Sequence, residues 1–465
     1  HDILPGSSIT EVYQDADRDY ALVRQLAETA RDEALSVIAS TLSSEYTLMA
    51  INPTSFNGHR IGLLPTTIQG VAYDGQALLT QVTDEGTLID LPQIPAYSVM
   101  GLSAGEASSQ TTTLTISETE TGIILENHLI RLIFTANGDL ISIYDKEVQR
   151  EVLAEGAIGN QFLMMEDRPL AWDAWDIDIF IDDRVEALDD IVSMHIVETG
   201  SIRAGLTIVR QYRASTITQT IYLYHHSKRV DFVTHVDWHE QHTLLKVAFP
   251  VDILSPTATY DIQWGNVERN THRNTSWDWG RFETAAQKWA DLSEGNYGVA
   301  LLNDCKYGYD IHQNVMRLSL LKGATMPDPV ADQGEHRMTY SLLPHTGDWR
   351  NGIPEEAYDL NDPLILCDIK GTTGTHSAHQ LVSSNQKHVI IETVKQADNG
   401  EGIIVRLYEG ERNRGTVKLQ CGFDVQTAYL CNLLEENESE LSVQDNAVTL
   451  TVRPYMIATV RFVPA

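Results

Sequence analysis

Short apolar runs separated by turn-forming residues dominate this chain from about residue 46 to its end. β-Branched and aromatic residues alternate with polar ones in these runs, a pattern typical of all-β domains. The clearest example covers residues 123–144, where three alternating runs are joined by short turns, one of them Asn137-Gly138-Asp139. Further strands are expected at 203–210, 218–224, 230–236 and 458–463. The sequence therefore predicts a mainly β fold of several β-sandwich domains, including a large super-sandwich.

One stretch near the N-terminus has helical periodicity instead. Three aspartates, Asp15, Asp17 and Asp19, favour its N-terminal end through the helix dipole. Ser43-Ser44 ends the pattern. We therefore expect one amphipathic helix over residues 14–42. Its apolar side chains recur at helical spacing, namely Ala21, Leu22, Leu26, Ala30, Ala34, Leu35 and Ile38.

Composition and turn signals divide the chain into four consecutive parts. The acidic, proline-containing residues 351–363 indicate a boundary, and the Ser/Thr-rich residues 108–115 are either a linker or an edge strand. Asn57-Gly58 and Asp74-Gly75 predict hairpin turns. The predicted parts are residues 1–45 with the helix, 46–112 as a small sandwich, 113–355 as the large super-sandwich and 356–465 as a C-terminal sandwich.

The charge balance limits the classes of partner. Lys and Arg number 33 against 65 Asp and Glu, a net charge of −32. Such a surface repels the phosphate backbone, so we expect no nucleic-acid partner. The charge suits a neutral or cationic ligand, although acidity can also serve solubility alone. The longest apolar runs are far too short to span a bilayer, so no membrane segment is expected.

The number and spacing of the cysteines, and the residues after His1, indicate where in the cell the protein is located. The four cysteines form no CxxC pair and are too few for a disulfide scaffold, which predicts reduced thiols in a cytoplasmic protein. The residues after His1 contain neither a basic nor an apolar segment of a signal peptide. We expect that material N-terminal to His1 has been removed or is a separate piece.

Residues 172–178 combine two tryptophans with three aspartates. Tryptophan rings stack on the apolar faces of pyranose rings, and carboxylates accept hydrogen bonds from sugar hydroxyls. The segment could therefore form a sugar-binding wall. The alternative is a sandwich strand with aromatic core residues and an acidic outer face.

Two further stretches can carry chemistry. Residues 269–283 are polar, aromatic and poor in turn signals, which indicates either a functional loop or a long buried connection with satisfied polar groups. Five histidines between His225 and His242 invite a metal interpretation, but HExxH is absent and a free histidine face on a strand is common. There is also no GxGxxG, Walker A or GxSxG motif.

The chain opens with His1-Asp2 before a Pro-Gly turn. Imidazole is a good zinc ligand, and an adjacent carboxylate can bind a metal or a sugar hydroxyl. On spacing alone, a frayed terminus is the better explanation of the dipeptide.

Several of these phrases together resemble glycoside hydrolase family 38, in its cytosolic and bacterial α-mannosidase branch. They occur in order over essentially the whole chain, and phrases of this length are far more specific than a short motif. The matching phrases are residues 1–9, 172–178, 271–279 with 281–283, 288–294, 297–308, 327–329 and 405–409.

The resemblance implies that residues 1–45 hold the end of an active-site segment and one helix of a helical bundle. In that family an N-terminal domain carries the aspartate nucleophile, the other acid/base group and most ligands of one zinc ion. The last zinc ligand matches His1, and the substrate-contacting aspartate matches Asp2. Residue chemistry and position in the phrases add Trp172, Asp173, Lys306 and Tyr307 as expected substrate-binding residues.

The implied activity is retaining hydrolysis of terminal α-linked mannose in oligosaccharides. Retention proceeds through a covalent glycosyl-enzyme with paired carboxylates about 5–5.5 Å apart. Zinc would bind the 2- and 3-hydroxyls of the −1 mannose. No residue of this chain matches the nucleophile, so we expect no catalytic residue here and an inactive chain in isolation. A homo-oligomer is compatible with the sequence.

Three alternatives remain open. The chain could be a non-catalytic carbohydrate-binding β module, or a structural or oligomerisation segment. It could also belong to another sugar enzyme with a super-sandwich, such as a disaccharide phosphorylase, although the long matching phrases argue against this.

Overall fold

The computed structural model describes residue 2, residues 4–370 and residues 372–465. In it, 51% of the residues lie in strands and 11% in helices, which confirms the prediction of a mainly β fold. The chain forms two compact units, each assembled from segments that are separated in the sequence. The large unit comprises residues 1–33, 111–261 and 268–357, and the small unit comprises residues 34–110, 262–267 and 358–465. The four consecutive parts stay a prediction.

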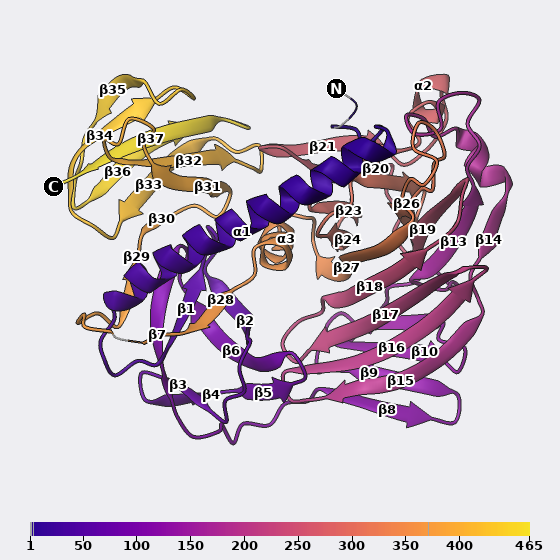
Figure 1. Cartoon of the computed structure of the whole chain (residues 1–465), viewed down its shortest axis with the longest axis horizontal. Helices are drawn as coiled ribbons and strands as arrows, with labels where there is room; N and C mark the ends of the chain where they lie inside the picture. The colour runs from indigo at the N-terminus through magenta and orange to yellow at the C-terminus, as the bar shows by residue number, and fades with distance from the viewer. Residues whose placement is uncertain (1, 3, 371) are drawn as a thin grey trace. The chain divides into compact units, whose positions relative to one another are not determined.

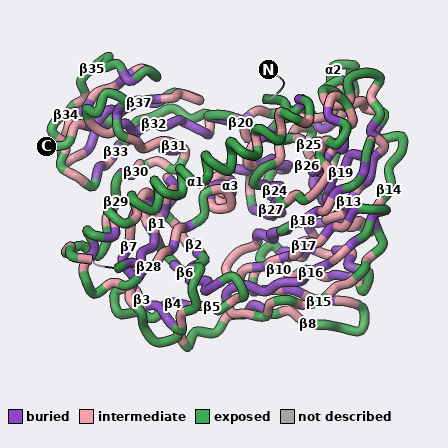
Figure 2. Tube along the Cα trace, viewed as in Figure 1, coloured by how far each residue is buried: buried purple, intermediate pink, exposed green. Residues whose placement is uncertain are grey.

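The predicted long helix is present as α1 (Thr10–Ser40), which begins earlier than residue 14. Its first residue is held from far along the chain, because Thr10 Oγ1 donates a hydrogen bond of 2.5 Å to Asp328 Oδ1. A local apolar pattern cannot show such a contact, which explains the difference in the start. Figure 2 shows α1 exposed over most of its length, and Leu22 and Leu26 are 54% and 61% exposed.

Three sheets form the body of the large unit (Figure 1). The five-stranded sheet has the order β12-β11-β10-β9-β8, with β8 at Thr115–Thr119, β9 at Gly122–Glu126, β10 at Ile130–Thr135, β11 at Leu140–Asp145 and β12 at Arg150–Glu151. The six-stranded sheet has the order β14-β13-β19-β26-β25-β22, with β13 at Gln161–Glu166, β14 at Val185–Ala187, β19 at Thr243–Pro250, β22 at Thr284–Ala285, β25 at Gly308–His312 and β26 at Val315–Leu321.

The nine-stranded sheet has the order β15-β16-β17-β18-β27-β24-β23-β20-β21. Its strands are β15 (Ile191–Thr199), β16 (Arg203–Tyr212), β17 (Ser215–Tyr224), β18 (Val230–Trp238), β20 (Thr257–Ile262), β21 (Gly265–Asn270), β23 (Trp289–Ser293), β24 (Tyr297–Asn303) and β27 (Gly334–Thr346). The hairpins predicted at 123–144 are β9, β10 and β11, and β16, β17 and β18 contain the other three strands predicted in this unit.

Aromatic side chains join the nine-stranded and six-stranded sheets. Phe232 on β18 stacks on Tyr340 of β27 with ring centroids 5.3 Å apart, and Phe249 on β19 lies 5.6 Å from Phe232. All three rings are fully buried. Every second residue of β17 is also buried, as expected for a strand with one face in a sandwich core.

Short helices interrupt the strands. The 3₁₀-helix η1 spans Ile179–Asp183, α2 spans Ser276–Trp279 and α3 spans Ile353–Asn361. The boundary segment predicted at 351–363 therefore contains a helix. Pro354 lies in the first turn of α3, where a missing N–H costs nothing, and Ile353 and Ala357 are fully buried.

The small unit also contains three sheets. The nine-stranded sheet comprises β1 (Leu48–Asn52), β2 (Gly58–Leu64), β3 (Val71–Tyr73), β4 (Gln76–Leu78), β5 (Thr80–Thr83), β6 (Gly86–Ile94), β7 (Ser98–Ala104), β28 (Ile365–Asp368) and β29 (Ala378–Gln380). A three-stranded sheet of β30 (Val382–Ser384), β33 (Gly415–Cys421) and β36 (Ala447–Val452) shares a core with a five-stranded sheet of β31 (Val389–Gln396), β32 (Ile403–Glu409), β34 (Val425–Cys431), β35 (Asn437–Leu441) and β37 (Ile457–Pro464), where the predicted last strand lies.

The two predicted hairpin turns of the small unit have different outcomes. Asp74-Gly75 connects the paired strands β3 and β4, and both residues have positive φ, as the prediction required. The hairpin predicted at Asn57-Gly58 is wrong, because β28 pairs with both β1 and β2 and separates them. A strand more than 300 positions away in the sequence cannot be anticipated from a local dipeptide.

Two other features bear on the sequence predictions. All four cysteines are free. Within the described part of the chain, no helix combines the length and the apolar character needed to cross a membrane.

Candidate functional site

The candidate site is a loop at one end of the six-stranded sheet. Register brings the end of β13, the start of β19 and the end of β26 together there, because Glu166 pairs with Thr243 and Leu245 pairs with Leu321. The loop of residues 167–178 leaves the sheet at this end. We call it the Trp172 loop.

Asp173 anchors the Trp172 loop to the segment after β26. Its Oδ2 accepts hydrogen bonds from the Thr325 backbone N–H at 2.8 Å and from Thr325 Oγ1 at 3.0 Å, and its Oδ1 accepts one from the Met326 N–H at 3.1 Å. Burial alone would raise the pKa of Asp173, but these hydrogen bonds and nearby His242 hold it below its usual value. The carboxylate is therefore ionised and largely committed to holding the loop.

Two indole rings project from the anchored loop. Trp172 has a φ of +60°, and its carbonyl accepts hydrogen bonds from the N–H groups of Trp175 at 2.8 Å and Asp176 at 3.2 Å. The two tryptophan rings meet edge to face with centroids 5.9 Å apart. They are 72% and 44% exposed. The left-handed turn thus presents two adjacent aromatic surfaces to solvent.

Asp2 lies against the same loop. The Trp175 Nε1–H donates a hydrogen bond of 3.3 Å to Asp2 Oδ1, and the Asp2 carbonyl accepts one of 2.9 Å from the Ser7 N–H. Asp328, which receives the hydrogen bond from Thr10, is itself buried. The structure thus brings three predicted residues together, Asp2, Trp172 and Asp173. The predicted zinc ligand His1 lies outside the described residues.

Lys306 and Tyr307 lie in the connection between β24 and β25. The Lys306 N–H donates a 2.5 Å hydrogen bond to Asn303 Oδ1, and the Tyr307 side chain is 63% exposed. Because Gly308 starts β25 where β26 ends, Tyr307 lies at the same end of the sheet as the Trp172 loop. Among the described residues, no hydrogen bond or ion pair links either of them to that loop.

An ion pair beneath the loop was missed by sequence reasoning. The Lys322 ammonium bonds Asp167 Oδ2 and donates to the Asp176 carbonyl at 2.7 Å. Asp167 is 1% exposed, and burial raises the pKa of its carboxyl despite Lys322. Neither residue belongs to a recognisable motif. The one usable signal was that Asp167 directly follows a strand and starts an aspartate-rich loop.

The five histidines and the segment 269–283 are the remaining candidates from the sequence. His242 Nδ1 lies 3.8 Å from Asp173 Oδ2, beside the anchor. Arg273 pairs with Asp182 of η1 at 3.0 Å and with Asp310 of β25 at 3.3 Å, and Glu283 pairs at 2.5 Å with the fully buried Lys246 of β19. These two charged side chains have satisfied partners, but Trp277 and Trp279 are 74% and 49% exposed, so the segment as a whole is not a buried connection.

The chemistry available at this site is recognition of a hydroxylated ligand. Exposed indole faces pack on C–H surfaces, and the Asp2 carboxylate retains lone pairs that can accept hydroxyl hydrogen bonds. Within the described residues, no three imidazole, thiolate or carboxylate ligand atoms gather around Asp2. The described residues around Asp2 therefore do not form a complete metal site by themselves.

Comparisons with known proteins show the family of the chain. Residues 125–330 match the glycosyl hydrolases family 38 C-terminal domain, and residues 388–460 match the glycosyl hydrolases family 38 C-terminal beta sandwich domain. The chain is 35% identical to alpha-mannosidase 2C1 of Mus musculus, over 100% of this chain and 44% of that protein. It is 30% identical to alpha-mannosidase G of Dictyostelium discoideum, over 100% of this chain and 47% of that protein.

A solved structure has the same fold. The alpha-mannosidase from Enterococcus faecalis V583 superposes with a TM-score of 0.81 at 16% identity, covering 98% of this chain and 61% of that chain. The chain spans about half the length of the curated relatives it matches. The family matches lead to one conclusion. The chain belongs to glycosyl hydrolase family 38 and carries the C-terminal domains of that family.

Proposed function

We propose that this chain is the C-terminal portion of a retaining α-mannosidase that removes terminal α-linked mannose from oligosaccharides. The names of its relatives support the activity, and the aromatic and acidic Trp172 loop supports a carbohydrate ligand. The observation that carries the proposal is the hydrogen bond from Trp175 to Asp2, because it joins the family's His-Asp phrase to the aromatic loop.

In this proposal, the chain supplies binding groups while the nucleophile comes from outside it. Asp2 accepts a hydrogen bond from a hydroxyl of the −1 mannose, and Trp172 packs on a sugar face. Asp173 positions the loop through Thr325 and Met326. Lys306 and Tyr307 line the same end of the sheet. Two-step retention would then require paired carboxylates about 5–5.5 Å apart in the complete site.

One zinc ion, with His1 among its ligands, is part of the proposal. When bound, zinc would hold and polarise the sugar hydroxyls. The described residues fit only a shared site, because Asp2 has no further metal ligands around it. The remaining ligands are therefore expected from the part of the protein outside this chain. The free cysteines are compatible with the proposed cytoplasmic location.

Turnover of an aryl α-mannoside tests the proposal. The complete protein should hydrolyse it with retention of anomeric configuration, and the isolated chain should give no turnover, because it contains no nucleophile. Proton NMR of the first-formed mannose distinguishes retention from inversion. Robust turnover by the purified chain, or inversion by the complete protein, would contradict the assignment.

A non-catalytic carbohydrate-binding module is the second candidate, favoured by the exposed Trp172 and Trp175 rings. That role predicts tight mannoside binding by the isolated chain and no loss of hydrolysis when Trp172 is replaced in the complete protein.

A further inference from the structure

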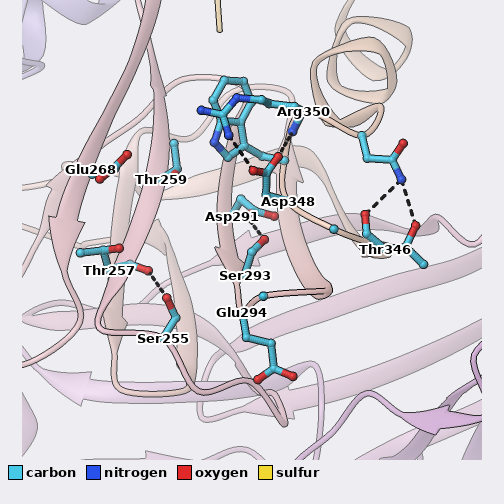
Figure 3. Close-up of a pocket in the computed structure, with 14 residues that line it drawn as sticks. Ser255, Thr257, Thr259, Glu268, Asp291, Ser293, Glu294, Thr346, Asp348 and Arg350 are labelled. Carbon is cyan, nitrogen blue, oxygen red and sulfur yellow. Dashed lines mark hydrogen bonds and ion pairs between the residues drawn. The ribbon is translucent and has the colours of Figure 1, made fainter. Parts of the chain in front are cut away.

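A polar cavity of about 700 Å³ opens in the large unit, lined by the β20, β23 and β27 strands and residues 347–351 (Figure 3). We call it the β20–β27 cavity. Its position differs from that of the Trp172 loop. β27 begins at Gly334, which pairs with Trp238 near the loop, and ends at Thr346, which lines the cavity. Thirteen strand residues span roughly 40 Å, so the two sites lie near opposite ends of β27.

Hydroxyl groups line one wall of the cavity. Thr257 and Thr259 are two residues apart on β20 and therefore project from the same face of the strand. Both side chains are half-buried, and among the described residues their hydroxyls have no hydrogen-bond partner. Figure 3 shows Thr259 beside Glu268. These hydroxyls can both donate to and accept from a ligand.

The carboxylates of the cavity already have cationic or imidazole partners. Asp348 pairs with Arg350 at 2.6 Å. Glu294 pairs with Arg150 at 2.7 Å, and its pKa lies below the usual value because that pair and the Leu254 N–H outweigh the effect of burial.

Asp291, which is 1% exposed, completes this pattern. Its Oδ2 lies 2.6 Å from His345 Nε2, and its Oδ1 accepts a hydrogen bond of 2.5 Å from Ser293. These three carboxylates thus need no further counter-ion, and Glu268 is not without a partner either. Each of the four retains lone pairs for a hydroxyl donor.

The lining of the cavity argues against three other classes of ligand, namely cations, anions and ligands held by aromatic stacking. Within the described part of the chain, no three metal-ligating atoms converge in this cavity, so it is not a preformed cation site. The excess of carboxylates disfavours anions. One face of Trp349 stacks on Trp289, with ring centroids 5.3 Å apart, and the Arg350 guanidinium lies 4.5 Å over the Trp349 ring. A ligand held mainly by aromatic stacking is therefore also disfavoured.

We propose that the β20–β27 cavity binds a neutral, hydroxyl-rich ligand, one carbohydrate unit, at a second site separate from the Trp172 loop. Sugar hydroxyls donate to Asp291, Glu268 and Asp348 and exchange hydrogen bonds with Thr257 and Thr259. The volume falls in the range of small-molecule sites. The choice of a mannoside as the probe rests on the proposed function, but binding here does not depend on hydrolysis.

Ligand-observed saturation-transfer NMR on the 465-residue chain, with methyl α-mannoside as the probe, tests this. The variant Trp172→Ala provides the background, because it removes the contribution of the other site. In that background, Thr257→Val with Thr259→Val should weaken binding about tenfold, because two hydroxyl hydrogen bonds are lost. Glu268→Gln, at an exposed position, should weaken it about threefold. The matched control is Thr218→Val on β17, a half-buried strand threonine outside the cavity, which should change nothing.

Each outcome decides the question. A signal that survives Trp172→Ala and falls with the threonine or Glu268 variants supports the second site. The proposal is overturned if Trp172→Ala alone removes all binding, if the cavity variants bind as the background does, or if no saturation transfer occurs. Thermal unfolding of each variant checks folding. Mannoside turnover by the complete protein is measured separately. A negative binding result would therefore overturn the second site without deciding whether the protein is an α-mannosidase.

Discussion

The indole Nε1–H of Trp175 donates a hydrogen bond of 3.3 Å to Oδ1 of Asp2. The two residues are 173 positions apart in the sequence. This contact fixes the orientation of an exposed carboxylate that would otherwise rotate freely, and it places that carboxylate beside two exposed indole rings. The candidate sugar site of this chain is built around it.

The contact predicts energetic coupling between the two residues. In the complete protein, Asp2→Ala and Trp175→Phe should each lower kcat/KM for an aryl α-mannoside. The double variant should lose less than the sum, by about 1 kcal/mol, because the same hydrogen bond is removed twice. A double-mutant cycle on kcat/KM measures this, and strict additivity would show that the hydrogen bond plays no part in catalysis.

Asp173 is expected to stabilise the large unit. Replacing it with Ala removes the acceptor of three hydrogen bonds and leaves the Thr325 and Met326 N–H groups unpaired, at a cost of about 2 kcal/mol in the free energy of unfolding. Asp176→Ala is the matched control in the same loop, because among the described residues that carboxylate accepts a hydrogen bond only from the N–H of its neighbour Ile177. Urea unfolding of the isolated chain compares them, and equal stabilities would remove the anchoring role.

The pH dependence of that stabilisation follows from the lowered pKa of Asp173. A carboxyl group whose pKa is lower in the folded state adds stability above its unfolded pKa and loses it as the pH falls through the folded pKa. The usual value is 3.8. The difference in unfolding free energy between the wild type and Asp173→Asn should therefore stay constant from about pH 7 to pH 5 and shrink below about pH 4. A difference that grows on acidification would contradict the direction of the shift.

Backbone strain at Trp172 gives a prediction with an internal control. Its φ of +60° favours glycine, so Trp172→Gly should be more stable than Trp172→Ala by about 0.5–1 kcal/mol. The order should reverse at Trp277, an exposed tryptophan in α2, because glycine is the poorer helix residue. Chemical denaturation of the four variants measures both differences. The same order at both tryptophans would show that φ does not control the effect.

Elements that neighbouring residues determine could be predicted from the sequence, whereas contacts between distant residues could not. Helix α1 and the β9–β11 hairpins arise from neighbouring residues, so periodicity predicted them. The Asn57-Gly58 hairpin failed because β28 arrives from a distant segment to separate two adjacent strands. In the site, the aromatic and acidic character of the Trp172 loop was visible in the sequence. The commitment of Asp173 to Thr325 was not, because it joins residues 152 positions apart.

Substitution of the His-Asp phrase in the complete protein tests the central claim most directly. Asp2→Ala should lower kcat/KM for an aryl α-mannoside about 10- to 100-fold, since a sugar hydroxyl loses a charged hydrogen-bond acceptor worth about 1.5–3 kcal/mol. Bound zinc should be retained in that variant. His1→Ala should lower both zinc content and activity, because one imidazole ligand is lost. Asp17→Ala, at an exposed position of α1, is the control and should change neither.

Zinc content is measured by atomic emission on the same samples as kcat/KM. Together the two measurements test whether His1 and Asp2 belong to the mannose site. The account predicts an active-site defect without metal loss for Asp2→Ala, and combined metal and activity loss for His1→Ala. Wild-type kcat/KM in Asp2→Ala, or unchanged zinc content in His1→Ala, would contradict the assignment of this end of the large unit to the mannose site.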